Sequence, residues 1–124
     1  MATTALMARI LADIDRYKDT QELVKASFLE RALTRKVSPD QLHPNPEDEF
    51  CFPEIGPNSS IITKYCQEAL RLVDCGLPVF PEPIQVVKMK PDGYMILNGH
   101  HRWAAAVQVA LKKIQVEIVN PRNL

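Results

Sequence analysis

The sequence predicts an α+β domain in which a small mixed β-sheet is surrounded by helices. Residues 84–89 and 94–97 are short apolar runs that flank the turn signal Asp92-Gly93, and this order is typical of a β-hairpin. Residues 114–119 alternate apolar and polar side chains, as a half-buried strand does. Stretches with apolar residues at helical spacing precede and separate these strands.

The first 36 residues predict a helical hairpin that precedes the main domain. Residues 3–17 carry apolar side chains at helical spacing. Asp19 and Glu22 have the spacing of a capping box, which predicts a second helix with apolar residues facing inward as far as Leu33. We therefore expect an N-terminal helical appendage at residues 1–36 and a domain at residues 37–124. The appendage either covers the core or serves as an arm for a homodimer or another partner.

A short edge strand at residues 37–42 is followed by a long, proline-rich loop at residues 43–58. Loops of this length in compact domains are often functional. This loop is acidic, and its carboxylates are candidates for a general base or for binding Mg²⁺. The alternative is a solvated turn. The candidate catalytic residues are Glu47, Asp48, Glu49 and Glu54.

The next helix begins at a cap provided by Asn58, Ser59 or Ser60 and ends at Gly76. A stiff crossover at residues 78–83 leads into the first long strand.

A polar cluster at the junction of a strand and a helix is the strongest candidate for a binding site. The strand at residues 94–97 ends at the turn Asn98-Gly99, and an alanine-rich helix is predicted over Trp103 to Leu111. The first turn of a helix has free N–H groups and positive dipole character, and arginine grips phosphate. Residues of these types predict a phosphate site, although they would also suit a solvated helix start. The candidate phosphate-binding residues here are Gly99, His100, His101 and Arg102.

The composition narrows the class of partner and the compartment. The net charge is zero and the pI is about 6.8, so no overall attraction to DNA or anionic membrane is expected. No apolar run has the length of a membrane span, and no signal peptide is evident. Three cysteines, an odd number, fit a reducing cytoplasm, and none has zinc-ligand spacing, so we assign no metal-binding residue.

Several segments of the chain resemble the ParB/sulfiredoxin superfamily. Leu42-His43-Pro44-Asn45-Pro46 resembles the element that opens the ParB N-terminal domain, and Glu82-Pro83-Ile84-Gln85-Val86 resembles its Pro-Ile-x-Val strand. The segment from Asp92 to Ala106 resembles the signature Gly-x-His-Arg turn before an alanine-rich helix. The resemblance covers about residues 37–119.

The resemblance implies a nucleotide or phosphate pocket at the signature turn. Gly99 would let the backbone approach, and His101 and Arg102 would hold phosphate oxygens. His100 stands where sulfiredoxins carry their reactive cysteine, so the resemblance argues against sulfiredoxin activity. Ser60 and Thr63 would add phosphate contacts, as residues of the corresponding sulfiredoxin helix do.

Two functions follow from the resemblance and remain open at this point. One is an ATP-dependent phosphotransferase, similar to a free-serine kinase branch, that acts on a small hydroxyl compound with one of the acidic loop residues as base. ATP or another nucleotide, with or without Mg²⁺, would be its cofactor. The other is a non-catalytic nucleotide sensor that binds DNA or a partner protein, of phage or mobile-element type.

Overall fold

The computed structural model describes residues 8, 9, 12, 22–52, 54–80, 82–90 and 92–121. The strands and helices in it occur in the following order: β1 (Glu22–Leu23), α2 (Phe28–Ala32), β2 (Arg35–Val37), the 3-10 turn η1 (Pro39–Gln41), β3 (Leu42–His43), the 3-10 turn η2 (Glu49–Cys51), α3 (Ser59–Asp74), β4 (Ile84–Lys90), β5 (Tyr94–Asn98), α4 (His100–Gln108) and β6 (Ile114–Val119).

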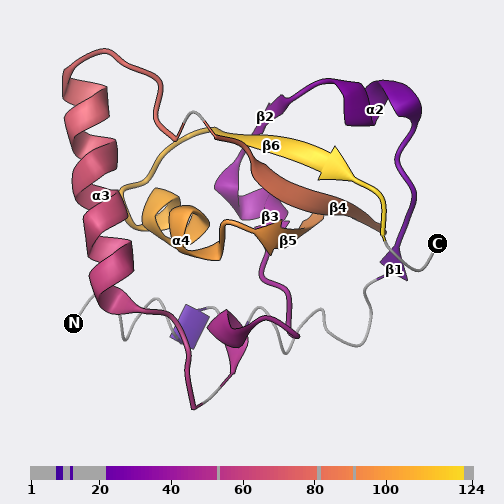
Figure 1. Cartoon of the computed structure of the whole chain (residues 1–124), viewed down its shortest axis with the longest axis horizontal. Helices are drawn as coiled ribbons and strands as arrows, with labels where there is room; N and C mark the ends of the chain where they lie inside the picture. Colours follow the sequence, from indigo (N-terminus) through magenta and orange to yellow (C-terminus); the bar gives the residue numbers. More distant parts are fainter. Residues whose placement is uncertain are drawn as a thin grey trace.

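The strands form one mixed sheet in the order β2-β6-β4-β5-β3, and β1 pairs with the end of β4 (Figure 1). The β4–β5 hairpin is antiparallel, with Val87 opposite Met95. The β4–β6 and β5–β3 pairs are parallel, and the β6–β2 pair is antiparallel. The predicted α+β class, with a mixed sheet and surrounding helices, is therefore confirmed.

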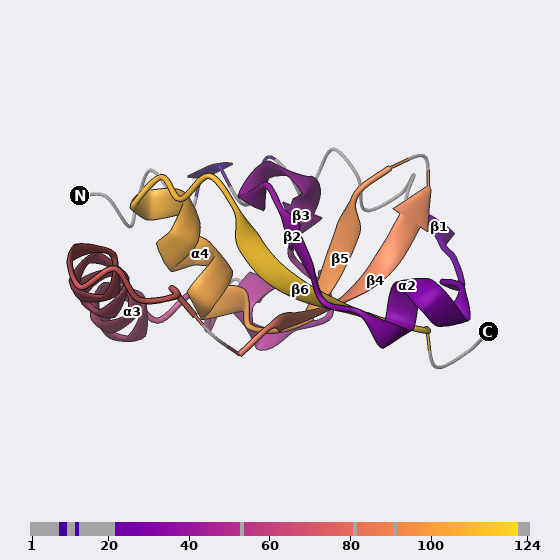
Figure 2. The ribbon, with the colours of Figure 1, turned by 90° about the horizontal axis from the view of Figure 1, so that it is seen from above.

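The helices form two layers beside the sheet. Viewed from above, α4 lies between α3 and the strands, and α2 lies at the opposite end of the molecule (Figure 2). Ala104, Ala105 and Ala106 are fully buried, and their small side chains allow α4 to approach both neighbours closely. They pack in one core with Ile62, Cys66 and Ala69 of α3 and with the buried residues of β4, β5 and β6. Trp103 also closes this core, and its indole N–H donates to the carbonyl of Pro39.

The predicted N-terminal helical hairpin is wrong in its second half. Glu22 and Leu23 form a strand that pairs with Lys90 and Met89, so Glu22 does not lie in the first turn of a helix. Asp19, the predicted cap, lies outside the described residues. The capping box belongs instead to Ser27 and Glu30, which begin the five-residue helix α2. The supposed inward residues Phe28, Leu29 and Leu33 are 74%, 72% and 65% exposed.

The rest of the predicted hairpin, residues 3–17, lies outside the described residues except for Ala8, Arg9 and Ala12, which are helical. The division of the chain at residue 36 stays a prediction, although β1 and β2 both join the sheet.

The elements after residue 58 agree closely with their predicted ranges. Asn58 is the N-cap of α3, and its side chain accepts from the backbone of Ile61. Helix α4 starts earlier than Trp103, at His100, and it ends earlier than Leu111, at Gln108. His100, His101 and Arg102 therefore lie on the first turn of the helix, as the position of the polar cluster in the sequence predicts. No helix in the described part of the chain is long and apolar enough to cross a membrane.

Candidate functional site

The N-terminus of α4 is left open by its capping residue. Gly99 is the N-cap, with φ of 108°, and no described side chain caps this turn. An added Cβ at Gly99 would lie 2.9 Å from Nη2 of Arg102 and 3.0 Å from Cγ1 of Ile84, so neither the conformation nor the space suits a larger residue. The free N–H groups of the first turn are therefore available to a ligand.

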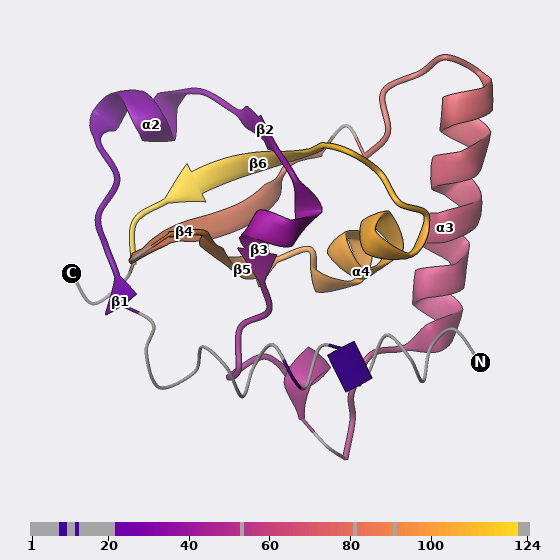
Figure 3. The same cartoon turned by 180° about the vertical axis from the view of Figure 1, so that it is seen from behind.

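A cavity of about 690 Å³ adjoins this open helix start. Its lining comes from α4, α3, the end of β5, the segment before β4 and the loop that contains η2. Figure 3 shows the course of that loop from β3 to α3. Its lining combines charged, polar and apolar side chains from all of these elements: Asp48, Ile61, Tyr65, Glu68, Phe80, Glu82, Leu97, Asn98, Gly99, His100, His101 and Arg102.

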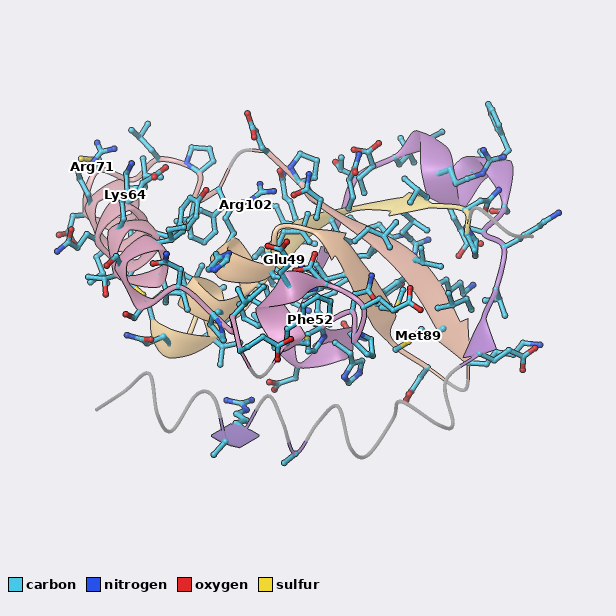
Figure 4. All side chains as sticks on the ribbon, turned by 60° about the horizontal axis from the view of Figure 1, so that its bottom comes forward. Glu49, Phe52, Lys64, Arg71, Met89 and Arg102 are labelled. Carbon is cyan, nitrogen blue, oxygen red and sulfur yellow. The ribbon has the colours of Figure 1, made fainter. Side chains whose placement is uncertain are left out.

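Arg102 contributes a guanidinium to this lining, and this group is positively charged at neutral pH. Its Nη1 donates to the carbonyl of Glu82 at 2.7 Å, which fixes the guanidinium beside the cavity. The bond to one carbonyl leaves other N–H donors of the guanidinium available to an anion. Figure 4 shows Arg102 apart from Lys64 and Arg71, which lie at the outer side of α3.

The two histidines act as hydrogen-bond acceptors. Nε2 of His100 accepts the backbone N–H of Asn45 at 3.0 Å, and Nε2 of His101 accepts the backbone N–H of Asn58 at 3.0 Å. An imidazole nitrogen that accepts an N–H carries no proton, so both rings are neutral in this arrangement. Phe50 packs against both rings, at 5.2 Å between centroids in each case.

Burial is the main influence on the titration of both histidines. It lowers the pKa of His100 to about 4, against the opposing effect of Asp48, and the neighbouring His101 lowers it further. Burial likewise lowers the pKa of His101, and Asp48 opposes this. Near neutral pH these rings therefore add no positive charge to the cavity.

Of the four acidic candidates, the structure brings only Asp48 to the cavity. Its Oδ1 accepts the backbone N–H of Phe50, and its Oδ2 lies 3.8 Å from Nδ1 of His100. Glu47, Glu49 and Glu54 are exposed and do not line the cavity. The short turn η2, capped by Asp48, explains the difference, because it turns one carboxylate inward and leaves its neighbours in solvent.

The structure does not bring Ser60 and Thr63 to the cavity either, since both are exposed on α3. α3 contributes Ile61, Tyr65 and Glu68 instead. Their spacing of four and three residues marks one face of a helix, and this signal could have identified them from the sequence. Glu82 and Asn98 also line the cavity. The sequence marks Asn98 as part of a turn and Glu82 as part of a resembling segment, but it does not indicate that either faces a ligand site.

The described residues include no cluster of three histidine, cysteine or carboxylate side chains that could hold a metal ion. A divalent cation at this site would therefore need ligands from elsewhere, such as the oxygens of a bound phosphate.

Comparisons with known proteins identify the fold. Residues 80–124 match the family model of the ParB N-terminal domain. The crystal structure of the C-terminally truncated chromosome-partitioning protein ParB from Caulobacter crescentus, complexed with CTP-gamma-S, is similar with a TM-score of 0.54 and 21% sequence identity. The similarity covers 73% of this chain and 46% of that chain, so the chain spans about half the length of that ParB structure.

The crystal structure of sulfiredoxin from Arabidopsis thaliana is also similar, with a TM-score of 0.50 and 16% identity, over 72% of this chain and 86% of that one. No curated protein matches the sequence. The resemblance to the ParB/sulfiredoxin superfamily is confirmed by the family model and by both structures, and at these identities the structures establish the fold.

Proposed function

We propose that the chain is a ParB-like, nucleotide-binding module that holds phosphate at the N-terminus of α4. One observation carries this proposal: Gly99 leaves the helix start without a side-chain cap, at a cavity that Arg102 also lines. Backbone N–H groups and the helix dipole attract an anion, and the guanidinium adds charge-assisted hydrogen bonds.

The size and the lining of the cavity suit a nucleotide better than a free phosphate ion. A volume of about 690 Å³ is in the range of small-molecule and cofactor sites. Ile61, Tyr65 and Phe80 give it an apolar wall against which a nucleobase could pack. The ParB structure with the same fold was determined with CTP-gamma-S, which supports CTP as the first ligand to test.

The test is calorimetric titration of the full chain with CTP and ATP, with and without Mg²⁺. Arg102→Ala should weaken binding at least tenfold, which corresponds to about 1.4 kcal/mol, because charge-assisted hydrogen bonds to phosphate are lost. Arg71→Ala is the matched control, since Arg71 is exposed on α3 and does not line the cavity. Equal weakening by both substitutions, or no binding by the unmodified chain, would refute the proposal.

A phosphotransferase is the second candidate, and the position of Asp48 in the cavity favours it. Asp48 would take the proton of a small hydroxyl compound, and the resulting oxygen would form a bond to the γ-phosphorus. The bond from that phosphorus to the β,γ-bridging oxygen would break and release a nucleoside diphosphate. Mg²⁺ bound to the phosphates would neutralise their charge.

This candidate is tested by the formation of ADP from ATP in the presence of free serine and Mg²⁺. Asp48→Asn should abolish turnover but leave nucleotide affinity within a few-fold, because the amide cannot accept the proton. Glu49→Gln should have no effect, since Glu49 is exposed outside the cavity. Turnover that survives in Asp48→Asn would rule Asp48 out as the base.

A further inference from the structure

The loop before α3 is tied to the first turn of α4 at both of its ends. We refer to residues 45–58, all of which are described except residue 53, as the strap. The backbone N–H of Asn45 donates to His100, and that of Asn58 donates to His101, each at 3.0 Å. Between these ends, the buried ring of Phe50 packs against both imidazoles. Two adjacent residues of one helix turn therefore hold a segment of fourteen residues.

Both ties depend on a lone pair that protonation removes. Nε2 accepts the amide hydrogen only when it carries no hydrogen of its own. A protonated imidazole has N–H groups on both nitrogens, so its Nε2–H would face the amide N–H and the bond would be lost. Protonation would also place a positive charge on a buried ring, because His100 is only 4% exposed.

We propose that the strap is a pH-sensitive latch, in which protonation of His100 and His101 releases the strap and withdraws Asp48 from the cavity. The proposal does not depend on nucleotide binding, because it concerns only contacts within the chain. Asp48 lies on the strap between the two ties, and its Oδ1 is held by the backbone of Phe50. Release of the strap would therefore remove the Asp48 carboxylate from the cavity, whereas Glu68 and Glu82 would remain.

The surrounding charges act on the two rings in opposite directions. Asp48 favours protonation of both, burial disfavours it in both, and His101 also disfavours protonation of His100. The charged and titratable groups that line the same cavity as His100 come from four elements: Asp48 on the strap, His101 and Arg102 on α4, Tyr65 and Glu68 on α3, and Glu82 before β4. Burial has the largest effect, and it lowers the pKa of both rings, so the latch is closed at neutral pH.

The released rings regain an ordinary histidine pKa near 6.5, whereas latched His100 has a pKa of about 4. Acid therefore favours the released state. From His100 alone, the equilibrium constant for release should rise about thirtyfold between pH 7.5 and pH 5. His101 acts in the same direction.

Amide hydrogen exchange of the full chain measures this release directly. The protection of Asn45 and Asn58, corrected for the intrinsic pH dependence of exchange, should fall at least tenfold from pH 7.5 to pH 5. The amides of β4, β5 and β6 lie in the core and exchange through global unfolding, so they should stay at least tenfold better protected than Asn45 and Asn58 at both pH values. Equal protection of the strap and the core would show that the strap opens only with global unfolding and would overturn the proposal.

A double substitution provides the second readout. His100→Gln with His101→Gln keeps a side-chain acceptor at each position but removes the titration, so the protection of Asn45 and Asn58 should become independent of pH. If that variant does not fold, the tautomer of each histidine in the unmodified chain is decisive. Nitrogen NMR at pH 7.5 should show both rings with the proton on Nδ1. A proton on Nε2 in either ring, or an unchanged pH response in the double variant, would refute the latch.

Discussion

The N-termini of α3 and α4 lie close together, but among the described residues only that of α3 has a side-chain cap. At the start of α3, the side chain of Asn58 accepts the N–H of Ile61, which satisfies one of the free donors of the first turn. At the start of α4, Gly99 has no side chain to offer, and no described side chain replaces it. One hydrogen bond, from the N–H of Asn58 to His101, joins the two helix starts.

The difference teaches where a ligand can be held. A capped helix start has stability but fewer free donors, whereas an uncapped one keeps its N–H groups available. The sequence-based expectation that Ser60 and Thr63 of α3 contribute phosphate contacts places ligands at the capped helix. In the structure these residues are exposed and outside the cavity, whereas the first turn of α4 lines it. If the proposed function holds, the ligand is therefore expected at the start of α4 and not at the start of α3.

The largest expected effect comes from removing the aromatic ring that packs against the start of α4. Phe50 is 2% exposed and packs against His100, His101 and Trp103. Phe50→Ala would leave a cavity there and should lower the free energy of unfolding by about 3–5 kcal/mol. Denaturant titration measures this loss. Phe28→Ala is the control, because its ring is 74% exposed, and it should change stability by less than about 0.5 kcal/mol.

Gly99→Ala tests the open helix start itself. The substitution places a Cβ on a backbone with φ of 108° and within 3.0 Å of Ile84, so it should cost about 1–3 kcal/mol of stability. It should also weaken nucleotide binding, because the contact with Arg102 at 2.9 Å displaces the guanidinium. Thermal unfolding and calorimetry measure the two effects. Gly76→Ala is a useful comparison, since Gly76 also has a positive φ but no atom within 4 Å of its added Cβ.

The two helix starts also show what the sequence could and could not predict. The open turn at Gly99 is a local feature, since a glycine and three polar residues between a strand and a helix suffice to indicate it. The strands β4, β5 and β6 were predicted for the same reason, because their apolar patterns are local. The role of the acidic loop is not local. Whether Asp48 or Glu47 faces the cavity depends on a single 3-10 turn, and this turn depends on the packing of Phe50 against α4.

The prediction for the N-terminal region was wrong for a related reason. Residues 22–33 have helical periodicity, but the backbone of Glu22 and Leu23 pairs with β4, a strand more than sixty residues later in the chain. Long-range pairing overrides local propensity in such cases. The roles of His100 and His101 as acceptors for Asn45 and Asn58 are equally non-local, and sequence patterns give no sign of them.

Acid should weaken the fold through the histidines that join the two helix starts. Because burial lowers the pKa of His100 to about 4, the unfolded chain binds a proton between about pH 6.5 and pH 4 that the folded chain does not. Stability from this group is therefore lost as the pH falls through that window, by about 2 kcal/mol between pH 7 and pH 5. Glu30, whose pKa is lowered from 4.5 to about 2, also stabilises the folded chain, but this stabilisation is lost only below about pH 4.5 and so does not contribute between pH 7 and pH 5. Denaturant titrations at the two pH values measure the loss, and His100→Gln should reduce it.

The smallest effect concerns the capped helix, and it provides the sharpest separation of the two helix starts. Asn58→Ala removes the side-chain acceptor for Ile61 and should destabilise the protein by about 1 kcal/mol. Nucleotide affinity should change by less than threefold, because Asn58 does not line the cavity and its backbone N–H to His101 is retained. Asn58→Asp keeps the acceptor and should restore stability. If Asn58→Ala weakened nucleotide binding as much as Arg102→Ala, the start of α3 would have to be counted as part of the binding site.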